Sequence, residues 1–129
     1  MRRLPLFGCA FALLALCGCS SNPNDALVRE QFAIIQKISK QVEAIKDDAS
    51  AATAIAQIEK EIQQLDDIKK KMKDMKLPEA EQKRLAEKFR AENETIKLNL
   101  AKAMEGVDER APKQYERLLN LLLGAYAGF

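Results

Sequence analysis

The feature that most constrains this chain is an 87-residue stretch without glycine, from Cys19 to Glu105. Its only prolines are Pro23 and Pro78, and it is rich in alanine, lysine, glutamate, glutamine, isoleucine and leucine. Those residue types favour helix, whereas glycine and proline interrupt it. Signals for strands are absent from the stretch. The sequence therefore predicts an all-α protein with long helices and few breaks.

The first predicted helix starts at Asn24 or Asp25, since either side chain can cap free backbone N–H groups. Its apolar face is formed by residues spaced three, four or seven apart: Val28, Ile35, Ile38, Val42 and Ile45. The pattern slips over residues 47–50, because the next apolar residue of the series, Ile55, lies ten positions after Ile45. We expect a break there, capped by Asp48 or Ser50, with one continuous kinked helix as the alternative.

Two further helices are predicted over about 50–76 and 79–104, joined by a minimal turn at Pro78. Helices of nearly equal length with a short connection form an antiparallel hairpin, here about 40 Å long. Gly106 ends the third helix, and Pro112 starts a last one. The predicted fold is an all-α, three- or four-helix bundle built around this long antiparallel helical hairpin, after a cleaved N-terminal signal.

The N-terminal segment has the organisation of an export signal. Arg2 and Arg3 precede an uncharged run from Leu4 to Gly18 that ends in small residues. A bilayer span needs about 20 apolar residues, so this run is too short for a comfortable transmembrane helix. We therefore expect the segment to be removed after export.

The order Leu16-Cys17-Gly18-Cys19 resembles the lipobox of bacterial lipoproteins, in which a cysteine follows a small residue and a leucine stands three positions before it. The resemblance implies that the Cys19 thiol receives a diacylglycerol and that the leader is cut just before it. Cys17 would instead require cleavage after bulky Leu16. An ordinary secretory signal is the alternative. The predicted organisation is a signal peptide over 1–18, a lipidated cysteine and tether over 19–24, and a helical domain over 25–129.

The same resemblance suggests a location. Ser20, directly after the cysteine, is compatible with transfer to the outer membrane of a double-membraned bacterium, facing the periplasm. Several acyl chains hold a protein stably to a bilayer, whereas one chain binds only marginally.

Composition excludes several classes of function. Beyond the leader the chain has 19 basic and 19 acidic residues, no cysteine after Cys19, and no histidine or tryptophan. This argues against a nucleic-acid binder, a disulfide framework and a histidine-based catalytic or metal site. Hydroxyl side chains are few and lack a histidine base. We therefore predict no enzyme activity, no cofactor, no metal and no small-molecule substrate.

A cluster of cations closes the second predicted helix: Lys69, Lys70, Lys71, Lys73 and Lys76. In one interpretation these charges complement the negative end of the helix. In the other they contact anionic headgroups, lipid phosphates or an acidic partner near the membrane. A 40 Å hairpin could carry its tip away from the anchored surface, which argues against a lipid contact.

Pairs of oppositely charged residues four positions apart, such as Asp66 and Lys70, are expected along the exposed helix faces.

The last twelve residues, 118–129, carry no charged side chain. They can form the fourth element of the core, a docking helix for another protein, or a segment that dips into a membrane. The segment is too short to span a bilayer. The residues predicted to make such contacts are Leu118, Leu119, Leu122, Tyr126 and Phe129.

The function predicted from the sequence is that of a lipid-anchored helical protein of the cell envelope. It would contact the membrane through Cys19 and act as a structural or protein-interaction module, with another protein or a second copy as its partner. The alternative function is a membrane-perturbing or pore-related lipoprotein that uses its apolar C-terminus.

Overall fold

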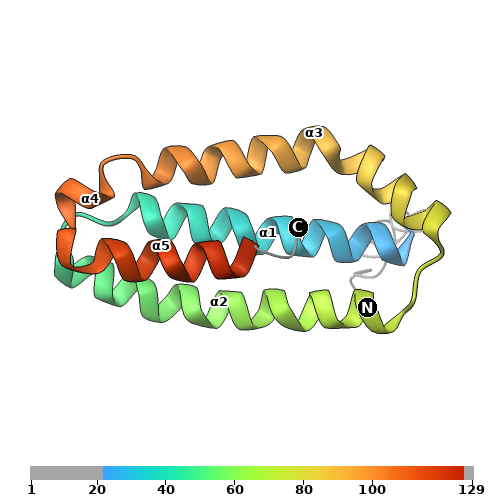
Figure 1. Ribbon diagram of the computed structural model, residues 1–129, viewed down its shortest axis with the longest axis horizontal. Coiled ribbons are helices and arrows are strands. Elements are labelled where there is room, and N and C mark those ends of the chain that lie inside the picture. The colour runs from blue at the N-terminus through green and yellow to red at the C-terminus, as the bar shows by residue number, and fades with distance from the viewer. Residues whose placement is uncertain (1–21, 127–129) are drawn as a thin grey trace, which may run out of the picture.

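The computed structural model describes residues 22–126, which form a bundle of α-helices (Figure 1). The helices are α1 (Pro23–Glu43), α2 (Asp48–Asp74), α3 (Glu79–Met104), the short α4 (Val107–Arg110) and α5 (Pro112–Tyr126). None of residues 22–126 lies in a strand, so the predicted all-α class is confirmed. The predicted signal peptide, Cys19 and Phe129 lie outside the described residues.

Local hydrogen bonds explain where α1 and α2 begin. The Oδ1 atom of Asn22 accepts a hydrogen bond from the backbone N–H of Asn24 at 2.9 Å, so α1 starts slightly earlier than predicted. Asp47 and Ser50 form a capping box at α2, in which each side chain accepts a hydrogen bond from the other's backbone N–H. The break between the two helices is therefore present. Asp47 is the cap, and the continuous-helix alternative is wrong.

Gly106 sets the turn after α3. It has a φ of 75°, in the left-handed region that glycine adopts without steric cost. A Cβ atom there would also lie 2.9 Å from Nη1 of Arg110. The turn leads into α4 and then back along the bundle as α5.

α1 is the central helix of the bundle. In Figure 1 it lies between α3 and α2, and it packs against both. The predicted hairpin of α2 and α3 is antiparallel, but each arm packs mainly on α1. The reason lies in the width of their apolar faces. α1 buries adjacent positions such as Ile34 and Ile35, so its buried face is wide, whereas α2 and α3 bury one narrow stripe each.

α5 completes the bundle on α2. It has 15 residues against 27 in α2, so it runs along only part of that helix. Leu118 and Leu122 are 0% and 4% exposed and belong to the main core cluster. Of the three interpretations of the uncharged C-terminal segment, the structure supports the fourth element of the core.

Candidate functional site

The start of α1 and the turn between α2 and α3 lie at one end of the bundle, which we call the tether end. This follows from the antiparallel order of α1 and α2 (Figure 1). A hydrogen bond of 3.3 Å from Nε2 of Gln31 to Sδ of Met72 links the two helices there. All five lysines predicted as a contact surface are in the last turns of α2 or in this turn. The tip of the hairpin therefore lies at the same end of the bundle as the start of α1, and the length of the hairpin does not carry these lysines away from that end.

A buried carboxylate fastens α1 to α3 at the tether end. Asp25, in the first turn of α1, is 6% exposed. Nη2 of Arg84 donates to its Oδ1 at 2.8 Å, and Lys88 donates to its Oδ2. A buried charge is tolerated when it is paired and hydrogen-bonded in this way. These contacts hold the first turn of α1 in place.

A second carboxylate extends this polar cluster toward the chain start. Glu81 accepts hydrogen bonds from Nη2 of Arg84 at 2.7 Å and from Nδ2 of Asn24 at 3.1 Å. Nδ2 of Asn22 donates to the same carboxylate at 3.4 Å. The first described residue of the chain is thus placed directly beside the start of α3.

These hydrogen bonds favour the ionised carboxylates. Donation by Arg84, followed by donation by Asn24, lowers the pKa of Glu81 to about 2. Donation by Lys88 and then by Arg84 lowers the pKa of Asp25. Both groups therefore remain charged in the folded protein at pH values where an unfolded chain binds protons.

The polar cluster should make stability depend on acidity. A carboxyl group whose pKa is lowered by folding stabilises the protein at pH values above the ordinary pKa of that group. This stabilisation is lost as the pH falls through the lowered pKa. For Glu81 the window runs from 4.5 down to about 2. At pH values above this window, we expect Glu81→Gln to lower the thermal midpoint by a few degrees. Near the lower limit of the window, the thermal midpoints of the variant and the wild type should be equal. Glu79→Gln, an exposed neighbour, is the control, and thermal melts over this range are the measurement. A constant difference at every pH would contradict a role for the charge.

The lysines at the tether end fall into two groups. Lys69 donates to the backbone oxygen of Ala125 and so contacts the end of α5. The other four are exposed, and none has an ion pair within residues 22–126: Lys70, Lys71, Lys73 and Lys76. The expected surface pair of Asp66 and Lys70 is not formed. These charges therefore point to solvent without being neutralised by the bundle.

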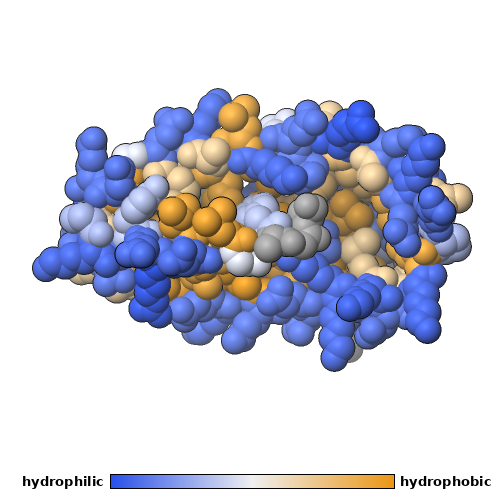
Figure 2. All heavy atoms as spheres, viewed as in Figure 1, coloured by the Kyte–Doolittle hydropathy of each residue, from blue (hydrophilic) through white to orange (hydrophobic). Residues whose placement is uncertain are grey.

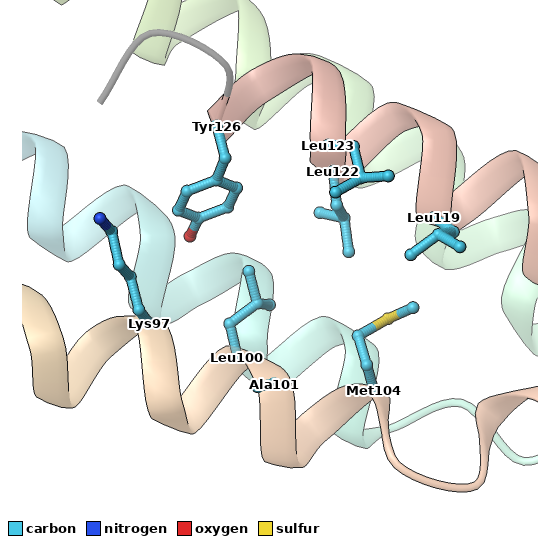
Figure 3. A pocket seen from close by; sticks show the side chains of 8 residues that line it. All are labelled: Lys97, Leu100, Ala101, Met104, Leu119, Leu122, Leu123 and Tyr126. Carbon is cyan, nitrogen blue, oxygen red and sulfur yellow. The ribbon is translucent and has the colours of Figure 1, made fainter.

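An apolar groove lies between α3 and α5, toward the middle of the bundle (Figure 3). Its volume is about 410 Å³. Figure 2 shows apolar side chains over α5 within a largely hydrophilic surface. The residues that line this α3–α5 groove are Lys97, Leu100, Ala101, Met104, Leu119, Leu122, Leu123 and Tyr126.

The groove contains part of the contact surface predicted from the sequence. Leu119, Leu122 and Tyr126 line it, and burial raises the pKa of Tyr126 to about 12. Leu118, predicted in the same set, does not line the groove; it is fully buried in the core and presents no surface to a partner in the folded bundle. Leu123 was missed, although it is 61% exposed on the groove rim. The signal for Leu123 in the sequence was that this apolar residue lies beside the main apolar stripe of α5.

Residues 22–126 hold no group of three or more acidic, histidine or cysteine side chains that could bind a metal ion. No helix within that range is both long and apolar enough to cross a membrane. The chain matches no protein-family model, no curated protein and no solved structure.

Proposed function

We propose that the protein is a lipid-anchored, non-catalytic module of the bacterial cell envelope that binds another protein through its helical bundle. The observation that carries the proposal is the position of Cys19, which ends a lipobox-like leader and lies four residues before α1. The described start of the bundle is fixed by Asn22, Asn24 and Asp25, so a lipid on Cys19 would hold a folded domain close to the membrane. By the resemblance at Ser20, this membrane is the outer membrane.

The α3–α5 groove supports a role in protein binding. It is open and apolar, and its rim residue Leu123 is 61% exposed. Exposed apolar side chains grouped on one face are typical of interaction sites, and a groove between two helices accommodates a partner helix. The membrane-perturbing alternative is less well supported, because Leu118 and Leu122 would have to leave the core before α5 could enter a bilayer.

Cys19→Ala tests the anchor. We expect this variant to lose the added lipid mass, retain its leader and leave the pool of lipid-anchored protein, because no other residue replaces the acylated thiol. Cys17→Ala is the matched control and should be processed and anchored like the wild type. The measurements are intact mass and extraction of membranes with high salt and detergent. An unchanged lipid mass in the Cys19→Ala protein would rule out the proposed anchor.

A further inference from the structure

The tether end is held within a short reach of Cys19. Nδ2 of Asn22 lies 3.4 Å from Oε1 of Glu81, in the first turn of α3. Three Cα–Cα steps separate Cys19 from Asn22, which span at most about 11 Å. If Cys19 carries a lipid, as the proposed function requires, the turn between α2 and α3 lies beside the bilayer surface.

The tether end carries an excess of positive charge. Its buried Asp25 is already paired with Arg84 and Lys88, and its partly exposed Glu81 is paired with Arg84. Exposed lysines remain around the turn: Lys70, Lys71, Lys73, Lys76 and Lys83. The exposed acidic residues over 70–83 are Asp74 and Glu79. The opposite end is acidic, with six acidic and three basic residues over 43–50 and 105–113.

A hollow of about 370 Å³ lies at this turn, lined by both cationic and apolar side chains. Its lining includes the cations Lys73 and Lys76, the apolar Met72 and Leu77, and Gln82, whose Nε2 donates to the backbone oxygen of Leu77 at 2.8 Å. Next to it, Met75 is 45% exposed. A lipid headgroup has the same two parts, an anionic phosphate and a less polar glycerol region, so the hollow matches its chemistry.

Lys76 occupies an unusual backbone conformation in this turn. Its φ is 47°, in the left-handed region, where glycine is the residue without steric cost. The chain therefore has a charged side chain at a position that geometry alone would give to glycine. This places a cation directly at the tip between α2 and α3.

We propose that the tether end docks on anionic phospholipid headgroups of the membrane that holds Cys19, through Lys70, Lys73 and Lys76. The inference rests on the proposed lipid anchor. A lipid surface is favoured over an acidic protein because the anchor keeps the bilayer within reach of these lysines. The anionic surface attracts the tether end and repels the acidic opposite end. Both effects orient the bundle so that its long axis points away from the membrane.

Residue-resolved lysine labelling tests the docking. The lipidated protein, its lipid first verified by intact mass, is reconstituted into vesicles of phosphatidylcholine alone or of phosphatidylcholine with phosphatidylglycerol. An amine-reactive reagent and peptide mass spectrometry then give the labelling rate at each lysine. We expect phosphatidylglycerol to slow labelling of Lys70, Lys73 and Lys76 roughly fivefold, which is the factor for one lysine attracted to an anionic surface. Labelling of the neighbouring exposed Lys71 and Lys83 should be slowed as well. High salt should remove this protection.

Two charge-matched variants provide the controls. Lys70→Gln/Lys73→Gln/Lys76→Gln should abolish the protection of the nearby Lys71 and Lys83. Lys46→Gln/Lys60→Gln/Lys102→Gln, at exposed positions away from the tether end, should leave it unchanged. Circular dichroism verifies that both variants are folded.

The possible outcomes separate the two proposals. Protein without lipid on Cys19 overturns both the anchor and the docking. Lipidated protein whose lysines are labelled equally in the two kinds of vesicle overturns the docking alone. Protection that requires an added envelope extract, and not phosphatidylglycerol, also overturns it and indicates an acidic protein as the partner.

Discussion

Ile38→Ala should lower the free energy of unfolding by about 2–5 kcal/mol, the range for removing most of a buried isoleucine side chain. Ile38 has an exposure of 0% and lies in α1, between the two arms of the bundle. The cavity left behind would lie inside the core of the bundle, to which Ile38 belongs. The surrounding helices can close such a cavity only in part, which adds to the lost burial.

Urea denaturation of the chain without its leader, followed by circular dichroism, measures the effect. Leu98→Ala is the matched control, because Leu98 lies on α3 with 55% of its surface exposed. Its truncation should change stability by about 0.5 kcal/mol or less. Equal losses at the two positions would contradict the central placement of α1.

The sequence alone was sufficient to predict the individual helices. The predicted third helix, over 79–104, has the same bounds as α3, because Pro78 and Gly106 are strong local signals at its two ends. The break near residue 47 was also predictable from the slip in the apolar pattern. These features depend on neighbours within a few residues, which a single sequence displays directly.

The arrangement of the helices was not predictable in the same way. Periodicity identifies the face that a helix buries but not the helix that covers it, so α1 was not foreseen between α2 and α3. Phe32 and Ile34, which flank the main stripe of α1, were the signals of a wider buried face. The contact of Asp25 with Arg84 spans 59 positions and has no local signature.

The lysine cluster illustrates the same limit. The sequence supplied the residues and their spacing, whereas their relation to the anchor depends on which end of the bundle holds the turn. Because α1 precedes α2 and runs antiparallel to it, the end of α2 returns to the start of α1. The length of the hairpin therefore does not carry these lysines away from the start of α1.

Leu118→Asp should destabilise α5 and the bundle by about 4 kcal/mol or more. Leu118 is 0% exposed against α2, so the variant both removes apolar burial and places a carboxylate where no water reaches it. Hydrogen exchange should increase along α5, and the urea midpoint should fall. If α5 instead served only to enter a membrane, the stability of the protein in solution would not change.

Leu123→Asp is the matched control on the same helix, and it also tests the α3–α5 groove. Leu123 is 61% exposed, so aspartate there remains hydrated and stability should change by about 0.5 kcal/mol or less. The charge would, however, lie on the rim of an apolar groove and should weaken a partner that binds there. Membrane proteins that co-purify with the wild type and are lost from the folded Leu123→Asp variant would support this groove as the interaction site. An unchanged set of co-purifying proteins would exclude it, because the fold is intact and only the groove has been altered.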